Sequence, residues 1–364
     1  MFILKSLFFL LFFIVVSCNN DITEKEELKT KLQNLINKEI TVLVPGIQLS
    51  IKHPNLGVIS VASGQANTKE NINLTITHSL RIASATKIFT AVLIMKLVEN
   101  KIININDTMK TLLPNLEFKT ANIITLKDLL QHTTGFKGYF NDDDDFQEYV
   151  IDNPKEVYSP EILFKKALNL HTPIESEIND EFHYTNTNYI ILGMIIEKYF
   201  NKSYKKCVEE EIINPLSLKN TLAINDISEI KDMAEGYFFI DNTNISGKKY
   251  NHSFLFSAGN IISRTSDLVE FIDALMKNKL ISKETLSIMK KYINTSSEDL
   301  EYGFGLGNFK NLGVGHNGLT LGYTSIVIYN KELNLSIAVL INALSKNASP
   351  IEIAKKVLII IKEL

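Results

Sequence analysis

The chain has 364 residues, of which 45% are hydrophobic and 22% charged, and its formal net charge at pH 7 is −3. This is the composition of an ordinary globular protein, and the length is sufficient for two packed subdomains around a large core. Because acidic and basic residues are interspersed, the chain has no basic field that would favour nucleic acid as a partner.

The N-terminal segment has the pattern of an export signal. Lys5 supplies a positive charge, and residues 7–16 form an apolar run that is too short to span a bilayer. The run ends in Val15-Val16-Ser17-Cys18, which resembles the bacterial lipoprotein box, in which cleavage precedes a cysteine that becomes lipidated. We therefore expect a signal peptide over residues 1–17, a lipid (palmitate-type) anchor at Cys18, and a polar tether over 18–25.

These features predict an exported, membrane-anchored lipoprotein of the bacterial cell envelope. An uncleaved anchor with an incidental cysteine is the alternative. The only other cysteine is Cys207. Because Cys18 would carry the lipid, we expect no disulfide in spite of the exported location.

The hydrophobic pattern predicts sheet-forming segments at both ends of the chain and a helical block between them. Near the N-terminus, residues 26–40 have helical period, and residues 46–52 and 58–64 form a strand pair around a turn at 54–57. Helices are then predicted over residues 84–100, 126–131, 160–170, 187–200, 203–213, 268–276 and 283–290. Short β-rich segments follow at 304–309, 312–315, 324–329 and 336–341, before an amphipathic helix at 349–364.

The simplest packing of this order is an α+β fold. One antiparallel sheet, built from about 26–80 and 250–364, would be flanked by the N- and C-terminal helices, and an all-helical part of about 81–249 would be inserted. Residues 26–364 would then form one catalytic domain. The acidic run Asp142–Asp145 lacks the Gly and terminal Glu of a calcium loop, so we expect a solvated turn there and no metal site.

Ser84 and Lys87 are the first pair that suggests chemistry. Ser84 lies between an extended stretch and a long apolar helix, and Lys87 follows one helical turn later on the same face, within reach of the Ser84 hydroxyl. A serine becomes a good nucleophile only when a neighbour takes its proton. The amide of Ser84, at a helix N-terminus, is a candidate oxyanion donor.

The general base is open at this point. An unperturbed lysine has a pKa of about 10.4, so Lys87 would need a much lower pKa, through burial, to act as a free base near neutral pH. Alternatively, a charged Lys87 could lower the pKa of Tyr184, whose phenolate would then accept the proton. Asn186, two residues further on, could hold Lys87 or a substrate carbonyl.

The third stretch is His316-Asn317-Gly318, which we place at the start of an apolar strand around residues 323–329. Gly318 removes the side chain where substrate would lie against a strand edge. The next amide, of Leu319, is then a candidate second oxyanion donor. His316 and Asn317 are candidate substrate-binding residues.

Together, Ser84-x-x-Lys87, Tyr184-x-Asn186 and the strand element at 316–318 resemble the penicillin-recognising serine hydrolases, which include class C-type β-lactamases, D-alanyl-D-alanine carboxypeptidases and related esterases. The segment 129–135, Leu-Leu-Gln-His-Thr-Thr-Gly, is similar to a turn that shapes the site in this family. The chain departs from the β-lactamase pattern where His316 replaces lysine and Asn317 replaces threonine or serine. Histidine at this position resembles the carboxypeptidase branch.

The resemblance implies a serine hydrolase that works through an acyl-enzyme, most like a D-alanyl-D-alanine carboxypeptidase on peptidoglycan-type peptides. A carboxylesterase or weak β-lactamase on the same site is a second hypothesis, and a catalytically silent cell-envelope binding protein is a third. The chain has no Gly-x-Ser-x-Gly elbow, no His-Glu-x-x-His and no nucleotide loop, so we expect neither cofactor nor metal.

Overall fold

The computed structural model describes residues 22–363, except 179–180, 228–229, 231 and 241–242. The predicted signal peptide and Cys18 lie outside the described residues. Within the described part, no helix has both the length and the apolar character needed to cross a membrane.

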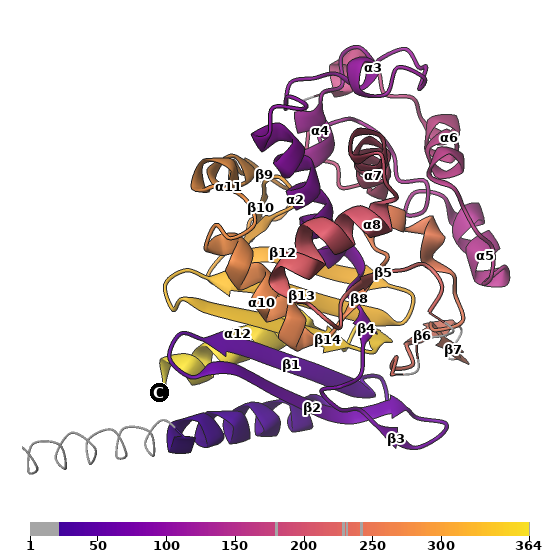
Figure 1. Cartoon of the computed structure of the whole chain (residues 1–364). Helices are drawn as coiled ribbons and strands as arrows, with labels where there is room; N and C mark the ends of the chain where they lie inside the picture. Colours follow the sequence, from indigo (N-terminus) through magenta and orange to yellow (C-terminus); the bar gives the residue numbers. More distant parts are fainter. Residues whose placement is uncertain (1–21, 179–180, 228–229, 231, 241–242, 364) are drawn as a thin grey trace, which may run out of the picture.

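A large antiparallel sheet joins the two ends of the chain (Figure 1). At its centre β1 (Gly46–His53) pairs with β14 (Leu335–Ile341), with Ile47 opposite Ile341 and Lys52 opposite Ser336. In the described residues the sheet has nine strands, in the order β3 (Ile72–Asn73), β2 (Gly57–Asn67), β1, β14, β13 (Tyr323–Asn330), β12 (Gly313–Thr320), β11 (Gly307–Phe309), β10 (Leu300–Tyr302) and β9 (Ile293–Asn294).

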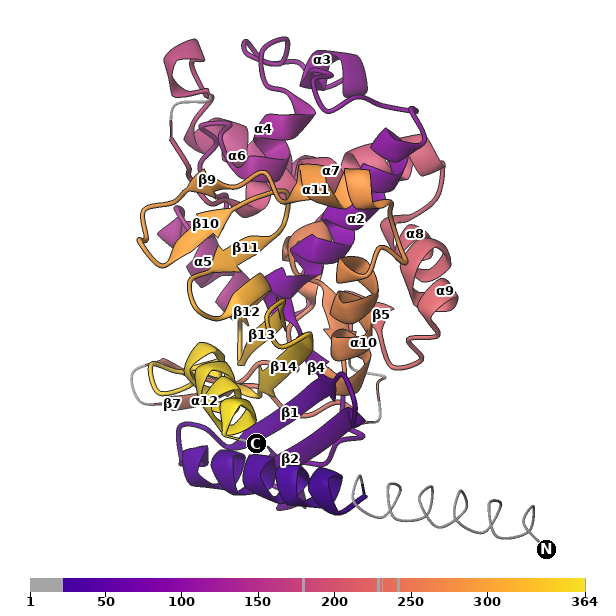
Figure 2. The same cartoon turned by 90° about the vertical axis from the view of Figure 1, so that its left-hand side faces the viewer.

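Both faces of the central strands are buried, and the side chains alternate between two cores. On β14, Ile337, Val339 and Ile341 face a core formed with the helix of residues 22–39 and α12 (Pro350–Lys362). Ala338 and Leu340 face the larger core on the other side, where α10 (Thr265–Met276) crosses the sheet. Figures 1 and 2 show the terminal helices on one side of the sheet and the helical part on the other.

The helical part is built around α2 (Thr86–Glu99), whose side chains are buried on nearly every side. α2 packs on α7 (Asn186–Phe200) and α8 (Tyr204–Val208). Because it is covered on all sides, its sequence is apolar on every face and not amphipathic. The remaining helices are α3 (Met109–Leu112), α4 (Leu126–Gln131), α5 (Asp144–Asp152), α6 (Pro160–Leu170), α9 (Asn214–Leu216) and α11 (Lys283–Met289).

Two small sheets connect the two parts of the domain. One has the order β4 (Leu80–Arg81), β8 (Ile261–Ser263) and β5 (Leu222–Ala223), and the other has β15 (Ala343–Leu344), β6 (Tyr237–Ile240) and β7 (Thr243–Ser246). β4 leads directly into the turn that carries Ser84.

The predicted α+β fold with one antiparallel sheet from both chain ends is confirmed, and three local predictions are wrong. The acidic run is not a turn, because Asp143 caps α5 by accepting from the amide of Phe146 and the next two aspartates occupy the first turn. His316 lies inside β12, one strand earlier than predicted. The short strands β5 to β7 interrupt the region predicted to be all-helical.

Candidate active site

A cleft of about 450 Å³ opens where the start of α2, the start of α7 and the edge of β12 meet. It is lined by residues that the sequence singles out and by additional apolar and hydroxyl side chains. The lining residues are Ser84, Asn141, Phe182, Tyr184, Asn186, Thr295, Ser296, Ser297, Leu300, Tyr302, Gly307, Phe309, His316, Asn317, Gly318 and Leu319. None of these described residues is an aspartate, glutamate, lysine or arginine.

Ser84 lies in a tight 3-10 turn, Ala83–Ala85, that leads into α2. Ala83 has φ +50°, which is rare for a residue with a side chain, and it redirects the chain from β4 into the helix. The carbonyl of Ile82, just before the turn, accepts hydrogen bonds from the Ser325 hydroxyl of β13 at 2.7 Å and from the Ala85 amide at 3.2 Å. Ser84 is not the N-cap residue of either helix, and it lines the cleft.

Lys87 lies beneath the cleft and is fully buried. Its Nζ donates to Asn186 Oδ1 at 2.7 Å and to the carbonyl oxygen of Ala258 at 3.0 Å, and it lies 3.2 Å from Ser84 Oγ. All three partners are neutral. Burial without a carboxylate partner therefore holds the pKa of Lys87 well below its usual value of 10.5. This geometry suits a neutral amine that takes a proton from Ser84.

Tyr184 immediately precedes the N-cap of α7, and its ring centroid is 4.9 Å from Lys87 Nζ. Its hydroxyl is buried and has no hydrogen-bond partner among the described residues. Burial raises the pKa of Tyr184 above its usual value of 10, and the nearby Ser84 hydroxyl only partly opposes this rise. A protonated Tyr184 fits proton donation better than the phenolate base considered from the sequence.

His316 faces the cleft from β12 but is almost completely buried. Its Nδ1 lies in hydrogen-bond contact with the Asn317 carbonyl, which can only accept, so Nδ1 carries the proton. Its Nε2 accepts from the Tyr302 hydroxyl at 2.9 Å. Burial is the main cause that lowers the pKa of His316 to about 3, and a positive charge on Lys87 acts in the same direction. The imidazole is therefore neutral and supplies no cation for a substrate carboxylate.

Gly318 is required where β12 passes the nucleophile. A Cβ at this position would lie 2.4 Å from the Ile82 carbonyl oxygen and 2.8 Å from the Ser84 amide nitrogen. The pairing of β11 with β12 ends at Gly315, so residues 316–320 pair only with β13 in the described sheet. The edge that carries Leu319 therefore runs along the cleft beside Ser84, where the two predicted oxyanion amides lie.

The structure thus brings together every residue that the sequence predicts for the site, although their individual chemical roles stay predictions. Four contributors were not singled out individually: the Ala258 carbonyl, Ser325, Tyr302 and the His132 ring. The first three come from segments distant in sequence and had no local signal. His132 belongs to the recognised 129–135 motif, but nothing in that motif shows that its ring reaches Tyr184.

The fold and this cluster define the class of protein: a serine hydrolase with the β-lactamase and penicillin-binding-protein fold. Residues 42–360 match the family model described as Beta-lactamase, and the chain belongs to that family. No metal-ligating group is present in the part of the chain that the structure describes.

Relatives by sequence include the Staphylococcus aureus (strain MW2) Protein flp, 23% identical over 315 residues, which covers 82% of this chain and 60% of the relative. The teichoic acid D-alanine hydrolase of Staphylococcus aureus (strain MRSA252) is 28% identical over 250 residues, covering 68% of this chain and 58% of the relative. The chain therefore spans about 60% of the length of these relatives.

Solved structures with the same fold include D-amino acid amidase from Ochrobactrum anthropi SV3, with TM-score 0.80 and 22% identity over 93% of this chain and 99% of that one. The D-stereospecific amidohydrolase from Streptomyces sp. has TM-score 0.77 and 26% identity, covering 86% of this chain and 93% of that one.

Proposed function

We propose that this serine hydrolase cleaves D-aminoacyl amides or esters through an acyl-enzyme on Ser84, and that it does not require a free carboxylate on the substrate. The observation that supports this most directly is the contact of a buried Lys87 amine, surrounded by neutral acceptors, with the Ser84 hydroxyl. A catalytically silent binding protein would have no need to keep this costly arrangement.

In the proposed mechanism, Lys87 accepts the Ser84 proton while Oγ attacks the substrate carbonyl carbon. The resulting oxyanion accepts hydrogen bonds from the amides of Ser84 and Leu319. Tyr184 gives a proton to the leaving amine or alcohol and regains one from Lys87. A water molecule then attacks the acyl carbon while Lys87 takes a proton from it, and the Oγ–acyl bond breaks as Lys87 returns that proton to Ser84 Oγ, which releases the acid.

The charge of the cleft supports substrates without a carboxylate. His316 is neutral, and none of the described lining residues is charged. A D-alanyl-D-alanine carboxypeptidase must bind the C-terminal carboxylate of its peptide, whereas D-amino acid amides and D-alanyl esters have no such group. The names of the D-amino acid amidase and the teichoic acid D-alanine hydrolase refer to substrates of this class. Histidine in the third motif keeps the carboxypeptidase as the second candidate.

The test compares three substrates with the wild-type protein and Ser84→Ala: a D-alanyl ester, a D-alanine anilide and an N-acylated D-Ala-D-Ala peptide. We expect ester and anilide turnover that Ser84→Ala abolishes, an acyl adduct on Ser84 by mass spectrometry, and much slower release of D-alanine from the peptide. Preferred cleavage of the peptide would instead establish the carboxypeptidase. No adduct and no turnover with any substrate would leave a binding protein.

We also propose that Cys18 carries a lipid that anchors the enzyme at the cell envelope, on the basis of the sequence around residues 15–18. Cys18→Ser should move the protein from the membrane fraction to the soluble fraction without changing its specific activity. Retention of the variant in membranes would contradict the anchor.

A further inference from the structure

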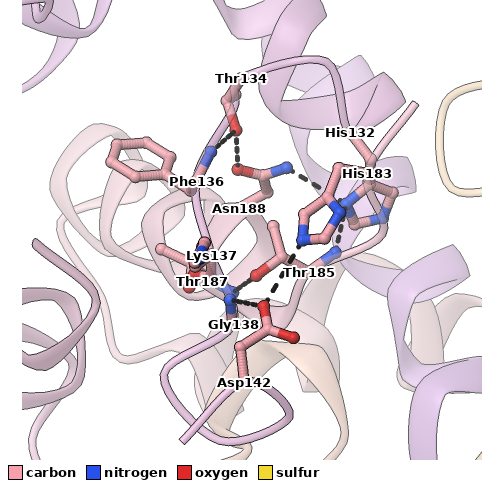
Figure 3. A network of polar contacts seen from close by, with 10 residues as sticks. All are labelled: His132, Thr134, Phe136, Lys137, Gly138, Asp142, His183, Thr185, Thr187 and Asn188. Carbon is pink, nitrogen blue, oxygen red and sulfur yellow. Dashed lines mark hydrogen bonds and ion pairs between the residues drawn. The ribbon is translucent and has the colours of Figure 1, made fainter. Parts of the chain in front are cut away.

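His132 makes hydrogen bonds to the residues on both sides of Tyr184. It is the left-handed C-cap of α4, with φ +61°, and is fully buried. Its backbone carbonyl accepts from the amide of His183 at 2.8 Å, and its Nδ1 accepts from the amide of Thr185 at 3.2 Å. The same Nδ1 also faces Asn188 Nδ2 at 3.1 Å (Figure 3).

The hydrogen bonds around Asn188 determine which atom is the donor and which the acceptor in the contacts of His132 Nδ1. Thr134 Oγ1 accepts from the amide of Phe136 at 3.2 Å and donates to Asn188 Oδ1 at 2.7 Å. The amide group of Asn188 must therefore turn its NH₂ toward His132. Because Nδ1 receives two N–H donors, it must be unprotonated, and the imidazole proton lies on Nε2. Nε2 is buried and has no hydrogen-bond partner among the described residues.

The imidazole ring also forms one wall of the tyrosine cluster beneath the cleft. Its centroid is 4.5 Å from that of Tyr184, 5.1 Å from that of Tyr189 and 5.1 Å from that of Tyr302. The charged or titratable groups that act on it are Lys87, His316 and His183, and each disfavours a positive charge on the ring. A protonated His132 would in addition direct an N–H at the Thr185 and Asn188 donors.

We propose that neutral His132 is the positioning residue that holds Tyr184 in place beside Ser84 and Lys87, through its paired bonds to residues 183 and 185 and its ring contact. This inference rests on the proposed function, because it assigns His132 an effect only through Tyr184. His132 does not line the cleft and is not itself a catalytic residue.

A second set of bonds in the same region supplies the control. Thr187 Oγ1 donates to the carbonyl of Lys137 at 2.8 Å, and Asp142 Oδ2 accepts from the amide of Gly138 at 2.7 Å (Figure 3). The bond between Thr187 and Lys137 joins the same two segments as the His132 bonds and does not involve Tyr184 or its immediate neighbours, whereas Asp142 Oδ2 also lies 3.4 Å from Nε2 of His183. Loss of the Thr187 bond alone should therefore affect stability without moving the tyrosine.

The experiment uses two variants that both tolerate the left-handed backbone. His132→Asn keeps a side-chain acceptor near the place of Nδ1, whereas His132→Gly keeps only the backbone carbonyl. We expect His132→Gly to lower kcat for the ester about 100-fold, with KM changed less than about 3-fold, and His132→Asn to recover about tenfold of that loss. Thr187→Val should lower Tm but leave kcat within about 3-fold.

Each variant is then combined with Tyr184→Phe. Because His132 acts through Tyr184, His132→Gly should cost less than about 3-fold in that background. An equal cost in both backgrounds, or equal kcat for His132→Asn and His132→Gly, would overturn the inference. Full activity of Tyr184→Phe alone would overturn the proposed role of Tyr184 and this inference together, whereas inactive Tyr184→Phe with unimpaired His132→Gly would overturn only the latter.

If His132→Gly does not fold, Thr134→Val replaces it, because it removes the hydrogen bond that orients the Asn188 amide, and the same non-additivity is expected.

Discussion

Burial lowers the pKa of the Lys87 amine well below its usual value, and its contacts offer hydrogen bonds but no negative charge that would stabilise the ammonium form. A base with a lowered pKa is ionised only below that pKa. We therefore expect kcat/KM to fall as the pH is lowered through the depressed pKa of Lys87 and to show no rise near pH 10. A profile of ester hydrolysis from pH 4 to 10 measures this.

Lys87→Arg is the matched variant, because an arginine carries a permanent positive charge and cannot act as a base. It should lower kcat by roughly 10³-fold or more, in line with the loss of a general base. Near-normal turnover by Lys87→Arg would show that the ammonium charge, and not proton acceptance, is what matters, and would return the base role to Tyr184.

Because His316 is neutral, it provides no positive charge that could bind a carboxylate of the substrate. A lysine in its place would bring a cation to the cleft wall, as in the β-lactamase pattern, and a charge-assisted hydrogen bond to a carboxylate contributes about 1.5 to 3 kcal/mol. His316→Lys should therefore speed acylation by a penicillin by at least about tenfold, measured by mass spectrometry over time. His316→Gln, which adds no charge, is the control, and an equal gain in both variants would contradict the electrostatic explanation.

At the scale of elements, the site depends on a 3-10 turn, η5 (Phe256–Ala258), being pressed between α2 and α7. Ser257 Oγ donates to the Tyr189 carbonyl at 2.7 Å, and Thr90 Oγ1 donates to the Ser257 carbonyl at 2.6 Å. These bonds place the Ala258 carbonyl on Lys87. The close approach is possible because α7 has a glycine, Gly193, where a Cβ would lie 2.1 Å from Ser257 Oγ.

Gly193→Ala should consequently push η5 away from α7. We expect a loss of about 1 to 3 kcal/mol in the free energy of unfolding, as for other overpacked sites, together with a lower kcat because the Ala258 carbonyl moves. Urea unfolding and ester kinetics measure the two effects. Gly138→Ala is the control, because the nearest atoms to its Cβ would be at 3.4 Å, and an equal loss in both variants would refute the packing argument.

Local patterns in the sequence predict most elements but not these contacts. The alternation of β1 and β14 and the helical runs of α2 and α7 follow from periodicity, and Ser84, Lys87 and Tyr184 follow from motif spacing. By contrast, the Ala258 carbonyl and Ser325 form hydrogen bonds with residues more than 170 positions away in the sequence. A backbone carbonyl, in addition, has no sequence signature at all. The strand predicted at 312–315 ends too early, because the glycines of β12 (Gly313, Gly315 and Gly318) weaken the β pattern where close packing requires glycine.

For the whole molecule, the central pairing of β1 with β14 means that the site forms only when both ends of the chain have folded. A change that lowers the stability of the fold therefore also disrupts the active site. Three fully buried histidines, His132, His252 and His316, are neutral in the folded state, and burial is the largest cause of the lowered pKa of each. In the unfolded chain each would have a pKa of about 6.5.

The sign of the resulting pH dependence is fixed. The unfolded chain binds more protons than the folded one between pH 6.5 and the depressed folded pKa, about 3 for His316, so stability is complete above 6.5 and falls as the pH falls through this window. From pH 7 to pH 5 His316, with its folded pKa of about 3, should contribute a loss of about 2 kcal/mol, and His132 and His252 change stability in the same direction. Glu197, whose pKa is raised by burial, opposes this trend slightly.

Because all three histidines act in the same direction, and the loss at His316 alone is a sizeable part of the stability of a typical domain, we expect the urea midpoint to drop steeply between pH 7 and pH 5. His252→Asn tests the assignment, because asparagine keeps a donor for the Tyr250 carbonyl, which lies 3.0 Å from His252 Nδ1, but cannot take up a proton. Its loss of stability between the two pH values should be measurably smaller than that of the wild-type protein, because burial lowers the pKa of His252 in the folded state. In acid, each buried histidine gains a proton when the chain unfolds, and this proton uptake is the proposed cause of the lost stability. A urea midpoint that does not change with pH, or a His252→Asn midpoint with the same pH dependence as the wild type, would show that the buried histidines do not control acid stability.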